Sequence, residues 1–316
     1  MSPSAMRKSL GAGLSLATLL LPVIGCGGGA QSVDDAVLVS APEAKTDAPA
    51  APAVGAPAAP TSPAAAPTAT PSAAVPSTAP APSATAAAGF GTLKGKVVLG
   101  GAAPTPKILV TKGDATVKDP SVCAKEDIKS ERLVLGKDNG VRYAIVYIPK
   151  PTAVSPEAKS AAETATVDFD QKGCTFVPHV VGVMTGSKIN IKSSDPVGHN
   201  VNSKVQNNPL NSAIAGGSEV PFTTQAAARA PGQVVCDIHP WMTAYWMVTD
   251  SPYITVTDAD GNFELKNVPA GSQKVVVWQE AKGFVTPSSG QDIVVAANGE
   301  TSQEFKIDPG ALKPEN

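Results

Sequence analysis

The stretch 231–246, PGQVVCDIHPWMTAYW, places a cysteine, a histidine and a methionine within seven residues. Cys236, His239 and Met242 follow the spacing C-x2-H-x2-M, in a chain that has only three histidines. A second histidine, His199, lies in the upstream stretch SSDPVGHNV (193–201). These four side chains are therefore the candidates for a shared metal-ligand set.

A thiolate, two imidazoles and a weak thioether are the donors of a type 1, or blue, copper site. Soft sulfur donors favour Cu(I), whereas imidazole accepts both oxidation states, so such a site changes little when an electron moves. The residue types of His199, Cys236, His239 and Met242 thus predict one copper ion and a role in electron transfer.

Three other interpretations of these residues stay open. Zinc also binds cysteine and histidine, but it prefers a tetrahedral set without thioether, and no further cysteine or histidine is close in the sequence. A copper-binding or delivery protein would use the same ligands and release the ion readily. In a metal-free structural module, Cys236 and Met242 would be core residues and His239 a turn residue.

Short β-rich runs separated by Gly, Pro, Asn and Asp surround the opening stretch. In KINIK (188–192), Ile189 and Ile191 alternate with polar residues, as in a strand with one buried face. The one helical candidate is a turn or two in SPEAKSAAETA (155–165). We therefore predict an all-β fold, mostly antiparallel, in one or two sandwiches.

The segments TFVPHVVGVMTGSKINIKSSDPVGHNV (175–201) and PGQVVCDIHPWM (231–242) together resemble the cupredoxins, with a short ligand loop of the amicyanin type. The resemblance implies a Greek-key β-sandwich over residues 165–252. It also implies equatorial copper ligands at His199, Cys236 and His239, with Met242 axial. In that family the residue at Asn200 ties the two ligand loops together by hydrogen bonds.

The same resemblance implies that electrons pass at an exposed ring edge of His239, with Pro240 and Trp241 as the docking surface for a redox partner such as a cytochrome c or a dehydrogenase. A site filled by its own ligands has no open position for substrate, so we expect an electron carrier and not an enzyme. The net charge of −2 and the lack of a basic run argue against nucleic acid as a partner.

The C-terminal region 253–316 includes TVTDADGNFELKNVPAGSQKVVVW (255–278), which resembles the carboxypeptidase-regulatory-like or transthyretin-like β-modules of exported proteins. That resemblance implies scaffolding. The N-terminal β region, residues 90–164, opens with the similar LKGKVVLGGAAPTP (93–106). It either pairs with residues 253–316 around an inserted copper domain or extends the sheets of that domain.

Residues 1–25 have the charge and apolar run of a secretory signal peptide. LPVIGC (21–26) resembles a bacterial lipobox, which implies a lipid on Cys26 and tethering at the periplasmic face of a bacterial membrane or at the cell surface. The alternative is an ordinary signal peptide with an incidental cysteine. Residues 26–89, rich in alanine and proline and without apolar periodicity, are predicted to be a disordered linker.

Cys123 and Cys174 remain outside the candidate ligand set. Two spare cysteines in an exported protein usually pair, so we predict a disulfide between them. The alternative is a second metal site formed by Cys123, Cys174 and His179.

Overall fold

The computed structural model describes residues 89–315 of the chain. The predicted signal peptide over 1–25, the predicted lipidation site Cys26 and nearly all of the predicted linker lie outside these residues. Within 89–315 the elements are overwhelmingly strands, so the predicted all-β fold is confirmed. No helix in this part of the chain is long and apolar enough to cross a membrane.

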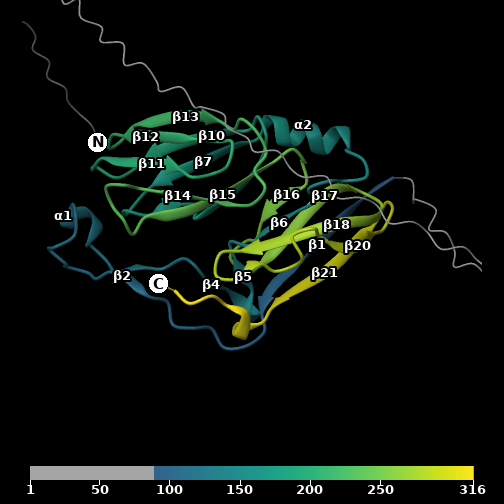
Figure 1. The fold of residues 1–316 in the computed structure, drawn as a ribbon, viewed down its shortest axis with the longest axis horizontal. Coiled ribbons are helices and arrows are strands. Elements are labelled where there is room, and N and C mark those ends of the chain that lie inside the picture. Colours follow the sequence, from purple (N-terminus) through teal and green to yellow (C-terminus); the bar gives the residue numbers. More distant parts are fainter. Residues whose placement is uncertain (1–88, 316) are drawn as a thin grey trace, which may run out of the picture. The chain divides into compact units, whose positions relative to one another are not determined.

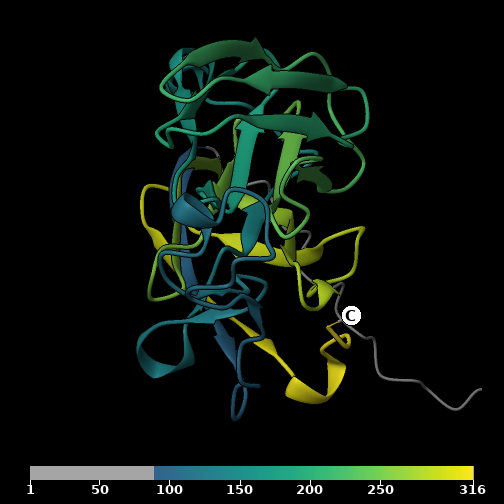
Figure 2. The same ribbon diagram turned by 90° about the vertical axis from the view of Figure 1, so that its left-hand side faces the viewer.

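The first sandwich spans residues 166–249 and consists of two facing sheets, seen among the green strands at the top of Figure 2. One sheet has the strand order β13-β10-β7-β8, and the other has the order β12-β11-β14-β15-β9. Their strands are β7 (Thr166–Gln171), β8 (Phe176–Val177), β9 (Val180–Met184), β10 (Lys188–Ser193), β11 (His199–Ser203), β12 (Leu210–Ile214), β13 (Glu219–Thr223), β14 (Gly232–Val235) and β15 (Thr243–Thr249). The chain repeatedly crosses between the sheets, as a Greek-key sandwich requires.

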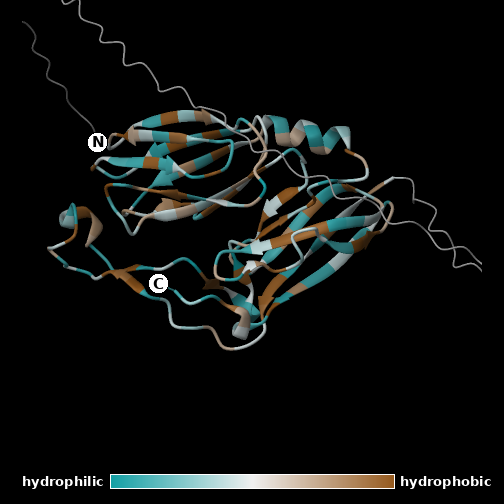
Figure 3. Ribbon diagram, viewed as in Figure 1, coloured by the Kyte–Doolittle hydropathy of each residue, from teal (hydrophilic) through white to brown (hydrophobic). Residues whose placement is uncertain are grey.

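Side chains from both sheets meet in one apolar core. Ile189 and Ile191 of β10 are fully buried while their polar neighbours face outward, as the alternation predicts. Trp246 of β15 packs edge-on against Phe169 of β7, with ring centroids 5.0 Å apart. Figure 3 shows hydrophobic and hydrophilic residues alternating along several strands of this sandwich.

The second sandwich combines the two ends of the described chain. Strand β1 lies between β17 and β21 in one sheet, and β6 lies between β16 and β18 in another. The strands are β1 (Phe90–Leu99), β4 (Val134–Leu135), β5 (Val141–Arg142), β6 (Ile145–Tyr147), β16 (Ile254–Val256), β17 (Asn262–Pro269), β18 (Gly271–Gln279), β19 (Gly283–Phe284), β20 (Gln291–Val295) and β21 (Glu300–Ile307). The N-terminal β region thus pairs with the C-terminal region, and the first sandwich is inserted between them.

Within residues 89–315 the helices are few and short. They are α1 (Pro120–Cys123), α2 (Pro156–Thr164) and the 3-10 turns η1 (Lys137–Asn139) and η2 (Pro309–Ala311). Helix α2 is longer than the turn or two predicted, because the Ser155 hydroxyl caps it by accepting the Ala158 N–H and Pro156 opens its first turn.

A segment from the N-terminal region, residues 108–129, leaves the second sandwich and packs on the first; we call it the capping arm. It holds β2 (Ile108–Val110), α1 and β3 (Ile128–Lys129), and β2 and β3 pair only with each other. In Figure 1 the blue chain runs from β1 out to α1 and returns towards β4 and β5. Val110, Cys123, Ala124 and Ile128 of the arm are buried in the core of the first sandwich.

The two sandwiches share a third, smaller apolar cluster. Tyr147 and Trp278 from the second sandwich meet Val180 and Met247 from the first. The rings of Tyr245 and Trp278 lie 5.1 Å apart across this contact. The second sandwich therefore supports the sheet that carries β14 and β15.

Replacing Ile191 by alanine should lower the free energy of unfolding by about 2–5 kcal/mol, because this fully buried side chain leaves a cavity. The matched change Ile108→Ala, at a side chain that is 49% exposed, should cost no more than about 0.5 kcal/mol. Urea unfolding of the two variants measures the difference. Equal losses would contradict the core described here.

Candidate metal centre

The candidate ligand loop connects β14 to β15 and is closed by its own backbone. The Cys236 N–H donates to the Met242 carbonyl oxygen at 3.2 Å, and the Met242 N–H donates to the His239 carbonyl oxygen at 2.9 Å. These bonds keep the three side chains of the C-x2-H-x2-M motif on one compact turn.

His199 reaches this loop because β11, which it begins, pairs with β14. Asn200 next to it connects the two segments: its Oδ1 accepts the Asp237 N–H at 2.6 Å, and its Nδ2 donates to Asp237 Oδ2 at 2.8 Å. The Asn200 N–H also points at Cys236 Sγ, at 3.5 Å. The side chain therefore does what the cupredoxin resemblance implied for it.

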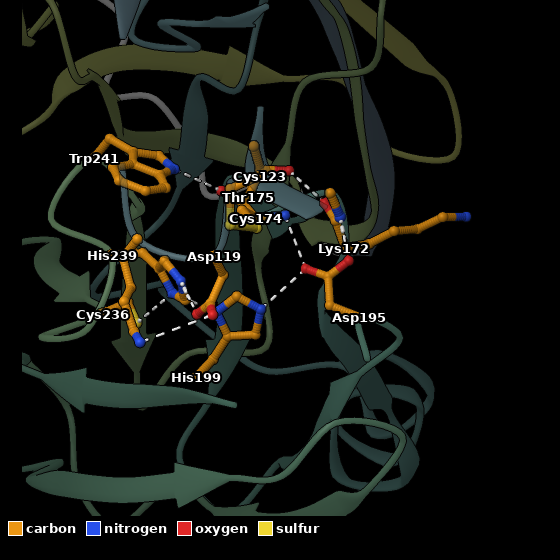
Figure 4. Close-up of a disulfide and its surroundings, with 12 residues drawn as sticks. Asp119, Cys123, Lys172, Cys174, Thr175, Asp195, His199, Cys236, His239 and Trp241 are labelled. Atoms are coloured by element: carbon orange, nitrogen blue, oxygen red, sulfur yellow. Dashed lines mark hydrogen bonds and ion pairs between the residues drawn. A yellow bond between two sulfur atoms is a disulfide. The ribbon is translucent and has the colours of Figure 1, made fainter. Parts of the chain in front are cut away.

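The three predicted equatorial ligands converge. Nδ1 of His199 lies 2.9 Å from Nδ1 of His239, and Cys236 Sγ lies 3.8 Å from the same His239 atom (Figure 4). One ligand atom from each of the three residues lies within 4.8 Å of the others. All three side chains are buried, as is Met242, which belongs to the same core cluster.

The spacing of these atoms fits a single ion. Zinc, an ion of similar size to copper, lies about 2.0 Å from histidine nitrogen and about 2.3 Å from cysteine sulfur in proteins. Because 3.8 Å is shorter than the sum of those lengths, one ion can contact both Cys236 Sγ and His239 Nδ1. The structure thus brings together the ligand atoms of three of the four predicted donors, His199, Cys236 and His239.

Electrostatics favour the metal-binding form of the cysteine. Burial alone would raise the pKa of the Cys236 thiol, but hydrogen bonds from His199 and from neighbouring backbone N–H groups outweigh burial and lower it. Burial disfavours the charged form of His199, yet Cys236 and Asp195 together raise its pKa. The pKa of His239 is lowered by its burial and by the charge on His199. Cys236 is therefore biased towards the thiolate, which is the form that binds metals.

The far nitrogen of each candidate histidine faces a carboxylate. His199 Nε2 lies 3.0 Å from Asp195 Oδ2, and His239 Nε2 lies 3.1 Å from Asp119 Oδ2 (Figure 4). Such partners fix the ring orientation and leave the other nitrogen free to bind a metal. Sequence reasoning missed both. Asp195 stands four residues before His199, which was a usable signal, whereas Asp119 is 120 residues from His239 and gave none.

The expectation of an exposed edge on His239 is wrong. Its side chain is 0% exposed because the capping arm covers it and places Asp119 against its outer nitrogen. Trp241 is partly exposed, with its ring centroid 5.3 Å from that of His239 and its Nε1–H donated to the Cys174 carbonyl oxygen at 3.1 Å. The neighbouring Pro240 is exposed.

An open pocket of about 680 Å³ lies beside the ligand loop. Pro240, Trp241 and Met242 form part of its wall, and His179 and Glu280 form another part. The part of the loop that carries Trp241 is therefore reachable from solvent, whereas the ring of His239 is not.

Cys123 and Cys174 form a disulfide that links α1 of the capping arm to the β7–β8 turn, with Cα atoms 5.2 Å apart. Their sulfurs lie within 4.8 Å of a ring nitrogen of His239. Because they are bonded to each other, neither is a thiolate ligand, and this excludes the alternative second metal site with His179 in this structure. The disulfide instead anchors the arm next to the candidate ligands.

His179 is held by side chains of the second sandwich and is not part of the candidate ligand set. It is buried, with Nε2 2.6 Å from Glu280 Oε2 and its ring centroid 5.5 Å from that of Tyr143. Both partners belong to the second sandwich, whereas His179 precedes β9 of the first. The side chain therefore links the two sandwiches.

Comparison with known proteins gives matches among solved structures alone: no family model and no curated protein matches the chain. A Cu-containing nitrite reductase from Thermus scotoductus is 22% identical over 31% of this chain, with a TM-score of 0.25, and the chain covers only 25% of it. A purple cupredoxin from Nitrosopumilus maritimus is 18% identical, with 27% of this chain and 99% of that one covered and a TM-score of 0.23. Amicyanin from Paracoccus versutus is 15% identical, with 33% of this chain and 96% of that one covered and a TM-score of 0.24.

Replacing Glu280 by alanine should lower the free energy of unfolding by about 1–3 kcal/mol, because the buried His179 loses its hydrogen-bond partner. Glu280→Gln keeps an oxygen that can accept from Nε2 and should cost less. Urea unfolding at neutral pH compares the two, and a glutamine variant as unstable as the alanine variant would argue against this role.

Proposed function

We propose that the chain is a type 1 copper protein that carries single electrons between redox partners. The observation that supports this most strongly is the convergence of one thiol and two imidazole Nδ1 atoms, from His199, Cys236 and His239, on a closed loop that also holds Met242. Copper bound there supplies the one-electron exchange between Cu(II) and Cu(I). The chain supplies the frame that keeps the donors in place.

The burial and hydrogen bonding of the candidate ligands suit electron transfer better than metal delivery. The side chains of His199, Cys236, His239 and Met242 are at most 2% exposed, and each histidine is held by a carboxylate on its far side. An ion in such a place leaves slowly, because the ligands must first be uncovered. The thioether of Met242 in the same loop favours copper over zinc.

Because the ring of His239 is buried, electron exchange with a partner requires another residue that reaches the surface. We assign this role to Trp241, whose ring lies against His239 and which also lines the open pocket beside the loop. Pro240 next to it is exposed, so the two residues form the contact surface for a redox partner such as a cytochrome c or a dehydrogenase. The site has no open position for substrate, and we propose a carrier without catalytic activity.

We further propose that the protein is exported and tethered to a bacterial membrane by a lipid on Cys26, with residues 26–89 as the linker between the lipid and the folded part. The support is the sequence alone: the apolar run, the LPVIGC segment and the alanine- and proline-rich composition that follows.

Titration of the purified protein with Cu(II) should produce an intense thiolate-to-copper absorption band that saturates at about one equivalent, because only one such donor set is present among residues 89–315. His239→Gln should abolish the band. His179→Gln, which removes a histidine outside this donor set, should keep it. Electron paramagnetic resonance and reduction and reoxidation cycles complete the test.

A wild-type protein without the band would refute the copper assignment and leave a metal-free scaffold as the remaining interpretation. A band that forms but does not cycle reversibly would instead indicate copper storage or delivery.

Met242→Leu should retain copper and raise its reduction potential, because loss of the weak axial donor stabilises Cu(I). Met247→Leu makes the same change at another buried methionine, which packs between the two sandwiches, and should leave the potential unchanged. Protein-film voltammetry gives both values. Equal potentials in the two variants would show that Met242 is not a copper ligand.

A further inference from the structure

The capping arm gives the candidate copper centre a residue from outside the first sandwich. The arm arises between β1 and β4 of the second sandwich, yet four of its side chains are buried in the core of the first. Its α1 turn is joined to the β7–β8 turn by the disulfide between Cys123 and Cys174. The arm is thus held at one place, directly over His239.

At that place the arm presents Asp119. Its Oδ2 lies 3.1 Å from His239 Nε2, and its side chain is 27% exposed while that of His239 is fully buried. Figure 4 shows the carboxylate of Asp119 at the ring of His239, on the side of the disulfide. Few geometries of the arm would allow this contact, because the aspartate side chain is short.

The backbone of Asp119 is also fixed. It has φ 54° and ψ 52°, in the left-handed region, and its carbonyl oxygen accepts the N–H groups of Val122 and Cys123 at 3.0 and 2.9 Å. Aspartate and asparagine enter this region more readily than other residues with a side chain. The α1 turn, the following Pro120 and the disulfide therefore determine where the carboxylate points.

Asp195 offers a comparison within the same site. It accepts from His199 Nε2, and it also accepts the backbone N–H groups of Gly173 and Cys174 at 2.7 and 2.8 Å. Asp195 is therefore a structural part of the first sandwich as well as a histidine partner. For Asp119, the contacts are the histidine and the exposed Lys118, whose Nζ lies 3.9 Å from Oδ1.

We propose that Asp119 is a positioning residue of the copper centre, brought to His239 by the capping arm to orient its imidazole and to lower the reduction potential of the site; this rests on the proposed function. The carboxylate accepts the Nε2–H of His239, which selects the tautomer whose Nδ1 lone pair is free for a metal. Its negative charge also favours the more positive oxidation state, Cu(II).

The test is Asp119→Asn. Asparagine has the same shape, tolerates the left-handed backbone and can still accept a hydrogen bond, but it carries no charge. We expect the potential to rise and the affinity for Cu(II) to fall by about tenfold to a hundredfold, the usual cost of losing such a partner. The matched control is Asp114→Asn, which removes one charge from the same arm at a side chain that is hydrogen-bonded to Thr116 and not to the candidate ligands.

A second readout needs no copper. In the copper-free protein, nitrogen NMR of the histidine rings should show His239 with its proton on Nε2, and Asp119→Ala should lose this preference while Asp114→Asn keeps it. Circular dichroism of each variant checks that the β fold is retained.

The outcomes separate the two proposals. If the wild type shows no blue band, the proposed function fails, and with it the copper role of Asp119. If the wild type is blue but Asp119→Asn matches Asp114→Asn in potential and affinity, the function stands and the positioning role is refuted. If only Asp119→Asn shifts both quantities, the role is established.

Discussion

Register between β11 and β14 is the constraint on which the candidate site depends. These strands share only a short stretch of pairing, from Asn202 opposite Val235 to Ser203 opposite Val234. A slip of one residue would turn His199 to the other face of the sheet and away from Cys236. The two hydrogen bonds between Asn200 and Asp237 oppose such a slip, because they join residues two positions beyond the last paired residues. Strand register and these hydrogen bonds therefore set the positions of the candidate ligands.

Much of this site was predictable because its determinants are local in the sequence. The spacing of Cys236, His239 and Met242 lies on one turn, and a tight turn leaves few ways to arrange three side chains. Strand alternation likewise predicts that Ile189 and Ile191 face a core, because the period of two holds whatever the strand pairs with. Such features follow from neighbouring residues, so the all-β class could be inferred without the partner of any strand.

What could not be predicted depends on contacts between distant residues. The burial of His239 is set by the capping arm, and nothing in VKDPSVC (117–123) indicates which surface this segment covers. The family resemblance led to the wrong expectation here, because the exposure of the histidine depends on what packs over the ligand loop and not on the ligand motif itself. For the same reason, the sequence did not decide which strands residues 90–164 pair with. A β-rich run indicates a strand, but the packing of the whole chain determines which strands lie beside it.

The insertion of the first sandwich has a consequence for how the chain acquires its structure. Strand β1 lies between β17 and β21, so one of its edges stays unpaired until residues 262–269 are available and the other until residues 300–307 are available. All strands of the first sandwich, and the capping arm that packs on it, come earlier in the chain. Contacts so distant in sequence form slowly, and unpaired strand edges readily join other chains. Until residues 300–307 pair with β1, its unpaired edge therefore exposes this protein to aggregation.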